Sequence, residues 1–186
     1  DNIIPYSINS SIYQNAGANI VQQIAYSLAL FTEYIELFGK EFMNNLQFKI
    51  AVGSNYFLEI AKIESLSFLI THIGNKYYSN KIIPIISSES SYRNKSIYDP
   101  YNNIVRSISE SMASLLSKVD YINTFSFDSI YGAPNMKSDR IPINQLRILK
   151  EEAYFSKTAN ISDGVYYLDY IKKQYCEKAI EVFKLI

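Results

Sequence analysis

Hydrophobic residues in this chain alternate between short apolar runs, typical of buried strands, and longer stretches with helical periodicity. The clearest helical stretch covers residues 20–35 and is followed by Gly39, a residue type that often ends helices. This spacing predicts a helix with one apolar face, formed by Ile20, Ile24, Leu28, Phe31 and Ile35.

The same hydrophobic pattern predicts alternating strands and helices in the rest of the chain. The predicted strands are Asp1–Ile8, Leu46–Val52, Ile82–Ile86 and Tyr121–Phe127. The further predicted helices are Tyr56–Thr71 (with Gly74 as its stop), Pro100–Lys118, Ile141–Ala153 and Tyr166–Leu185, while Asn9–Asn15, Ser87–Tyr98 and Ser156–Gly164 are expected to be loops.

The best-marked helix start is at Asp99. Asp99 is a favourable N-cap residue, and Pro100 suits the first helical position. Ile104 and Ile108 then recur at helical spacing. We therefore expect a helix that begins directly after Asp99.

Alternation of strands and helices predicts an α/β fold with a parallel sheet. The strand centres recur about every 40 residues, which favours a (β/α)8 TIM-type barrel over an irregular open sheet. Such a barrel usually needs roughly 250 residues and eight strands, whereas this chain has 186 residues. We therefore interpret residues 1–186 as one partial domain, the C-terminal half of a barrel with four βα units and a terminal helix. A longer parent chain or self-association would supply the missing half, and the absence of an initiating methionine favours the former.

Composition narrows the function classes. Eighteen acidic and eighteen basic residues cancel, so we expect neither a nucleic-acid partner nor an anionic membrane surface. Cys176 is the only cysteine, which excludes an intramolecular disulfide and a cysteine-built zinc site. No apolar run is long enough to span a bilayer, and no signal peptide is visible. The expected location is the cytoplasm.

In β/α barrels the functional groups follow the carboxyl ends of the strands. Hydroxyls and amides dominate there, and these groups can bind a ligand but are poor general acids or bases. The candidates are Asn9, Ser10, Ser11 and Gln14, then Ser54 and Asn55, then Ser87, Ser88, Glu89 and Arg93, and finally Asn123, Thr124, Ser126 and Asp128.

Residues suited to proton transfer are scarce. His72, the single histidine, falls near a predicted helix end, away from the strand ends, and is interpreted as a capping or surface residue. Cys176 is interpreted as a semi-buried structural thiol. Glu89 and Asp128 could form an acid–base pair, although surface loop acids are commoner. The phosphate-loop, dinucleotide, zinc-protease and dithiol motifs do not occur.

Several motifs, in preserved order along nearly the whole chain, resemble those of the adenosylcobalamin-dependent methylmalonyl-CoA mutase family. The sequence around Asp99 resembles that family's DPYNN helix start. The other similar segments resemble its QEAGA, VQELAY, AIGMNFFMEIAK, SARIARN and GSYYVE sequences. The matching residues are Gln14–Ala18, Val21–Tyr26, Ile50–Lys62, Asp99–Arg106, Ser138–Ile141 with Asn144, and Gly164–Asp169.

The resemblance also identifies departures from the family's catalytic chains. Ile12 stands in place of a histidine ahead of the QEAGA segment, and Ile85 and Ser87 replace the arginine and histidine of an Arg-x-His sequence. A gapless count from Asp99 places Asn123 at a third histidine, and Phe125 replaces an asparagine. Loss of one such hydrogen-bond donor typically costs about 3 kcal/mol of transition-state stabilisation. The resemblance therefore implies a retained scaffold without a catalytic site, with Gln14, Ser87 and Asn123 as the remaining candidates for substrate binding.

These features favour the small, non-catalytic subunit of a two-chain mutase, paired with a catalytic subunit that binds adenosylcobalamin and interconverts methylmalonyl-CoA and succinyl-CoA. This chain itself would bind no cofactor. An alternative is a degenerate barrel that still binds an acyl-CoA and acts on a different, less polar acyl group. A third hypothesis is a self-contained β/α interaction module.

Overall fold

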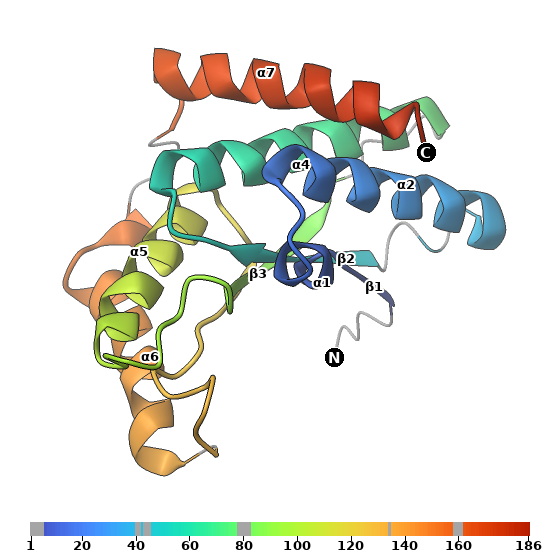
Figure 1. Cartoon of the computed structure of the whole chain (residues 1–186). Coiled ribbons are helices and arrows are strands. Elements are labelled where there is room, and N and C mark those ends of the chain that lie inside the picture. Colours follow the sequence, from blue (N-terminus) through green and yellow to red (C-terminus); the bar gives the residue numbers. More distant parts are fainter. Residues whose placement is uncertain (1–5, 40–41, 43–45, 78–82, 134, 158–161) are drawn as a thin grey trace.

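The computed structural model describes residues 6–39, 42, 46–77, 83–133, 135–157 and 162–186 (Figure 1). Strands and helices alternate along this part of the chain, as the hydrophobic pattern predicts. The elements are β1 (Tyr6–Asn9), α1 (Ser11–Asn15), α2 (Ile20–Phe38), β2 (Leu46–Val52), α4 (Tyr56–Tyr77), β3 (Ile85–Ser90), α5 (Asn102–Leu116), β4 (Tyr121–Asn123), α6 (Met136–Glu151), the 3-10 turn η1 (Phe155–Lys157) and α7 (Tyr166–Phe183).

The four strands form one parallel sheet in the order β1-β2-β3-β4. Ile8 lies opposite Phe48, and Phe48 lies opposite Ile86. The chain is therefore an α/β protein whose strands follow one another across the sheet in sequence order, so that their carboxyl ends meet at one edge.

One face of the sheet carries the hydrophobic core. Phe48 of β2 is 2% exposed and packs edge-on against Phe31 of α2, with 5.5 Å between the ring centroids. Helices α2 and α4 lie on this side of the sheet, and α7 lies across both of them as a further layer (Figure 1). The core joins β1, β2, α2 and α4, because their apolar side chains all point into the same space.

The opposite face of the sheet is polar. Side chains alternate between the two faces of a strand, so Lys49, next to Phe48, points away from the helices that cover Phe48. Asn9 lies beside Lys49 in β1, and Ser87 lies beside it in β3. Most parallel sheets are buried on both faces by apolar residues, and this polar row differs from that pattern.

Several predicted boundaries are wrong. The helix predicted to end at Thr71 runs through Gly74 to Tyr77. Gly74 is buried, so tertiary packing keeps the helix continuous at this glycine. The loop predicted at Asn9–Asn15 contains the short helix α1. The strand predicted at Tyr121–Phe127 ends at Asn123, and of the strand predicted at Asp1–Ile8 only residues 6–8 lie within the described part of the chain.

The third strand differs most from the prediction. It was expected at Ile82–Ile86, but β3 runs from Ile85 to Ser90. Ser87–Ser90 pair with Lys49–Val52, so backbone hydrogen bonding extends the strand through a run of polar side chains that gives no hydrophobic signal. Residue 82 lies outside the described residues.

Two helix starts also differ. The helix after Asp99 begins at Asn102, because Pro100 and Tyr101 form a turn and the Asp99 carboxylate accepts from the side-chain amide of Asn102 (2.7 Å) instead of capping the backbone. Helix α6 begins at Met136, ahead of the predicted Ile141, since the Asn135 side chain accepts from the N–H groups of residues 137 and 138. None of the described helices is both long and apolar enough to cross a membrane.

Replacement of Phe48 by alanine tests the core. The change removes a buried ring that packs on Phe31, and we expect the free energy of unfolding to fall by about 3–5 kcal/mol. The control is Phe68→Ala, since Phe68 is 60% exposed and its loss should cost about 0.5 kcal/mol or less. Chemical denaturation measures both, and equal effects of the two changes would contradict this assignment of the core.

Candidate functional site

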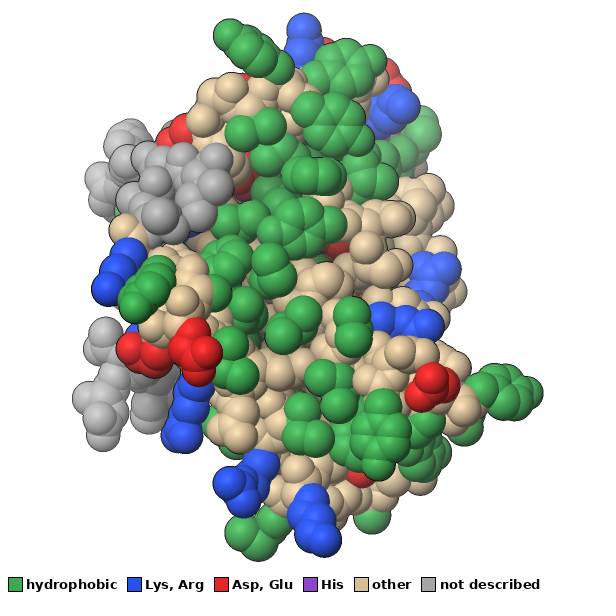
Figure 2. All heavy atoms as spheres, turned by 90° about the vertical axis from the view of Figure 1, so that its left-hand side faces the viewer, with side chains coloured by type: hydrophobic (Ala, Val, Ile, Leu, Met, Phe, Trp, Pro, Cys, Tyr) green, Lys and Arg blue, Asp and Glu red, His purple; other side chains and the backbone are tan. Residues whose placement is uncertain are grey.

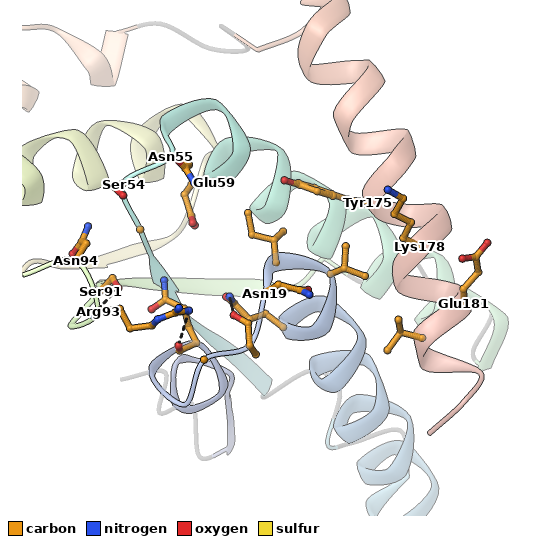
Figure 3. Close-up of a pocket in the computed structure, with 18 residues that line it drawn as sticks. Asn19, Ser54, Asn55, Glu59, Ser91, Arg93, Asn94, Tyr175, Lys178 and Glu181 are labelled. Atoms are coloured by element: carbon orange, nitrogen blue, oxygen red, sulfur yellow. Dashed lines mark hydrogen bonds between the residues drawn. The ribbon is translucent and has the colours of Figure 1, made fainter.

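A pocket of about 920 Å³ lies at the carboxyl ends of β1, β2 and β3 (Figure 3). Gln14 in α1, Asn55 after β2 and Arg93 after β3 line its inner side. Tyr175 and Lys178 of α7 line the far side. Carboxyl ends of parallel strands are where ligands bind in β/α proteins, so this pocket is the candidate functional site.

Of the predicted substrate-binding residues Gln14, Ser87 and Asn123, only Gln14 lines this pocket, together with Ser54, Asn55 and Arg93 from the wider set of strand-end candidates. Gln14 is 5% exposed, and its side-chain oxygen Oε1 is buried without a hydrogen-bond partner. Arg93 Nη1 donates to the backbone carbonyl of Gln14 (3.3 Å), which ties the loop after β3 to α1. A buried amide oxygen without a partner is an acceptor available to a donor group of a ligand.

Gly53 separates Gln14 from Glu59. A Cβ atom at position 53 would lie 3.1 Å from Glu59 Oε1 and 3.3 Å from Gln14 Nε2. A side chain at position 53 would thus require these two polar groups to shift by a few tenths of an ångström. An amide and a carboxylate in this arrangement suit a ligand with hydroxyl or N–H donors.

Helix α4 supports this corner with a buried ion pair. Glu59 and Lys62, three residues apart, lie on one side of α4 and form a salt bridge while 4% and 1% exposed. Lys62 Nζ also donates to the carbonyl of Ala51 (2.6 Å) and to Oε1 of Gln23 (3.3 Å). The lysine thus compensates the charge of Glu59 at the pocket. These residues were not among the predicted candidates, although an acid and a lysine three apart at the start of the helix after β2 were a visible signal.

Ser87 and Asn123, the other predicted binding residues, do not line the pocket. Both belong to strands, where Ser87 lies beside Lys49 and Asn123 lies beside Glu89. Lys49 Nζ lies 2.6 Å from Glu89 Oε2 in an ion pair between β2 and β3. The predicted candidates therefore divide between the pocket and the row of polar groups on the sheet.

The remaining positions that the resemblance marked lie apart from the pocket lining. Ile12 is 54% exposed on α1, and Ile85 is the first residue of β3. Neither aliphatic side chain can donate a hydrogen bond.

The two predicted carboxylates have separate partners. Glu89 is paired with Lys49, while Asp128 accepts from Nδ2 of Asn135 (3.1 Å) ahead of α6. Burial alone would raise the pKa of Asp128, but hydrogen bonds from Ser126, Ser138 and Asn135 hold that pKa below its usual value. Asp128 is therefore ionised at neutral pH and orders a loop, which suits it poorly to act as a general acid.

His72 lies on the surface and Cys176 is half-buried, as the sequence predicts, but His72 does not lie at a helix end, because α4 continues to Tyr77. His72 is exposed on α4 and stacks on Phe68 with 6.1 Å between ring centroids. Cys176 is half-buried in α7, and burial raises the pKa of its thiol. In the described ranges no three His, Cys, Asp or Glu residues are grouped so that they could hold a metal ion. The pocket lining itself carries ionisable side chains, namely those of Glu59, Tyr175, Lys178 and Glu181.

These features define an α/β domain with a ligand pocket at the carboxyl ends of its parallel strands. The sequence model of the family described as methylmalonyl-CoA mutase matches residues 2–186, and the chain belongs to that family.

The chain is 32% identical to the methylmalonyl-CoA mutase small subunit of Porphyromonas gingivalis over 95% of its own length and 30% of the relative's. It is 32% identical to the methylmalonyl-CoA mutase of Rhizobium meliloti (93% of this chain, 26% of the relative). It is 31% identical to the mitochondrial methylmalonyl-CoA mutase of Homo sapiens (97% and 25%). The chain thus spans about a third or less of the length of these relatives.

Replacement of Lys62 by methionine tests the buried ion pair. The change leaves Glu59 charged, buried and without its cation, so the free energy of unfolding should fall by about 3–5 kcal/mol. Glu59→Gln combined with Lys62→Met should recover most of this loss. Lys76→Met, at an exposed position near the end of the same helix, is the matched control. Single and double variants of equal stability would contradict the assigned pairing.

The raised pKa of Cys176 predicts a distinct pH dependence of alkylation. Because the fold favours the neutral thiol, less reactive thiolate is present near pH 8 than in a free cysteine, and iodoacetamide should react more slowly. The rate should keep rising at pH values where the reaction of the denatured chain has levelled off. Mass spectrometry of native and urea-denatured protein measures both profiles, and coinciding profiles would refute the effect of burial.

Proposed function

We propose that this chain is part of the non-catalytic small subunit of a methylmalonyl-CoA mutase, a complex that interconverts methylmalonyl-CoA and succinyl-CoA. In this proposal residues 1–186 form about the C-terminal half of a (β/α)8 barrel, with four βα units and the terminal helix α7. The likeness to a relative named as a small subunit supports the assignment.

The polar row on the sheet supports the half-barrel. Asn9, Lys49 and Ser87 lie side by side on the face opposite Phe48, where an open parallel sheet would need an apolar cover. In a closed barrel this face is the interior, enclosed by the remaining strands. The outer strands β1 and β4 would then pair with the strands of the other half.

The Lys49–Glu89 ion pair is the observation that carries the non-catalytic assignment. It lies on the same polar row as Ser87, the position at which the family's catalytic chains carry a histidine. Lysine neutralised by its neighbour offers little to a substrate carboxylate, and Ile85 and Ile12 offer nothing. The histidines and the arginine of the catalytic chains are thus replaced by Ile12, Ile85, Ser87 and Asn123, and the nearby lysine is paired with Glu89.

The proposed partner is a catalytic mutase subunit, which would carry adenosylcobalamin. His72 is the only histidine of this chain, and it lies outside the pocket lining on α4. The pocket therefore has no imidazole to offer to a metal, which agrees with a cofactor held by the partner. The proposed complex is cytoplasmic and has no nucleic-acid partner.

One observation favours the alternative of a degenerate barrel that binds an acyl-CoA. The pocket retains an unpartnered acceptor in Gln14 and an arginine in Arg93, so a polar ligand has groups to contact. Such a barrel would act on a different acyl-CoA from that of the catalytic subunit.

Activity of the separated subunits tests the proposal. The full-length protein that contains this chain, purified without a partner and supplied with adenosylcobalamin, should show no conversion of methylmalonyl-CoA. Co-expression with the catalytic subunit should yield one complex with full turnover. The proposal fails if the protein alone turns over methylmalonyl-CoA with cobalamin.

Calorimetric titration with acyl-CoA compounds distinguishes the structural subunit from the acyl-CoA-binding barrel. If the subunit is purely structural, acetyl-CoA, propionyl-CoA and butyryl-CoA should give no heat of binding with the full-length protein. Saturable binding that Gln14→Leu weakens and Gln174→Leu, on α7 outside the pocket lining, does not weaken would favour the acyl-CoA-binding barrel.

A further inference from the structure

Asn103, in the segment that resembles DPYNN, holds two loops at once. The side chain is 1% exposed on α5. Its Nδ2 donates to the carbonyls of Ser96 and Phe127, each at 2.9 Å. Its Oδ1 accepts from the N–H of Ser96 and from Nη1 of Arg106, also at 2.9 Å. Ser96 belongs to the loop after β3, and Phe127 belongs to the loop after β4.

Only an amide can make this set of bonds. An asparagine side chain offers two N–H donors and an oxygen with two lone pairs, and all four are used here. Aspartate would keep the acceptor bonds but would face two carbonyl oxygens without a donor. Asn102, the adjacent residue of the same type, is exposed and bonds only to Asp99 through its side chain in the described structure.

A buried ion pair fixes the same loop to α5. Lys95 Nζ lies 2.7 Å from Glu110 Oε1, and the two side chains are 1% and 2% exposed. Asn94 Nδ2 donates to the same carboxylate oxygen at 2.5 Å. These bonds fix the residues directly after Arg93, which itself lines the pocket.

Aromatic contacts connect the two loops to each other and to α5. Tyr92, after β3, stacks on Phe125, after β4, with ring centroids 4.5 Å apart. Tyr101 stacks on Phe127 at 5.0 Å. The two loops are therefore joined both by the hydrogen bonds of Asn103 and by the stacking of Tyr92 on Phe125.

We propose that Asn103 is a positioning residue for the pocket, which makes the loops after β3 and β4 one rigid unit and presents Arg93 and Asn94 to the pocket. The polar wall on the β3 side is then preformed and does not close over a ligand as a lid. This inference concerns the pocket wall only, and it stands whether or not the subunit is catalytic.

Hydrogen exchange of the full-length protein tests this coupling. In Asn103→Ala, peptides from residues 91–98 and 124–128 should both exchange about tenfold faster, because the shared bonds are lost. Peptides from α2 and β2 should be unchanged, and Asn102→Ala should match the parent protein. Faster exchange in only one loop, or in the whole chain together, would overturn the proposal.

Asn103→Asp separates positioning by the amide from simple filling of space. It should loosen both loops as the alanine variant does, since both donors are lost, and retained protection would overturn the proposal. If neither variant folds, the double variant Lys95→Met with Glu110→Leu is measured in their place, because it leaves Asn103 unchanged. Hydrogen exchange should then become faster in residues 91–98 but not in residues 124–128, and faster exchange in both loops would overturn the proposal.

A spin label reports the loop directly. With Cys176→Ser as background and a nitroxide on Ile97→Cys, an exposed loop position, the spectrum should narrow in Asn103→Ala and not in Asn102→Ala. An unchanged spectrum in Asn103→Ala would contradict the positioning role, whatever the effect on overall stability.

Discussion

A parallel sheet has two faces to cover, and this requirement organises the molecule. Phe48 and its neighbours bury one face under α2 and α4, with α7 across both helices. The other face presents Asn9, Lys49 and Ser87 in register. Lys49 pairs with Glu89, and Asn9 Oδ1 accepts from Ser11. Polar groups of this kind disfavour an apolar layer over the face. The sheet thus has one apolar face, which the helices cover, and one face that carries a row of polar side chains.

Several lysines of this structure form ion pairs with glutamates close to them. Lys49 pairs with Glu89, Lys62 with Glu59, and Lys95 with Glu110. A buried pair adds little net stability, but removal of one member leaves an uncompensated charge. The Lys49–Glu89 pair joins β2 to β3, and the Lys95–Glu110 pair joins the loop after β3 to α5, whereas Lys62 and Glu59 pair within α4.

Sequence reasoning succeeded where hydrophobic periodicity was strong. Helix α2 was predicted correctly because its apolar face is continuous up to Gly39. Gln14 was predicted as a site residue because functional groups in β/α proteins follow the carboxyl ends of the strands, and it does line the pocket. β3 was misplaced because Ser87–Ser90 are held by backbone pairing to β2, which leaves no apolar pattern. Tyr175 of α7 was missed for another reason: it reaches the pocket only through tertiary packing, which sequence spacing does not encode.

The two sides of the pocket differ in origin. The inner side comes from segments that follow the strands, whereas the outer side comes from α7, a helix anchored to α4 by the ion pair of Lys172 with Glu64 (2.9 Å). Tyr166, the first residue of α7, is 91% exposed. Figure 2 shows further hydrophobic side chains spread over the face that lies to the left in Figure 1. Substitutions in α7 can thus alter one side of the pocket without any change at the strand ends. The α7 side and the strand-end side of the pocket can therefore change independently of one another in this chain.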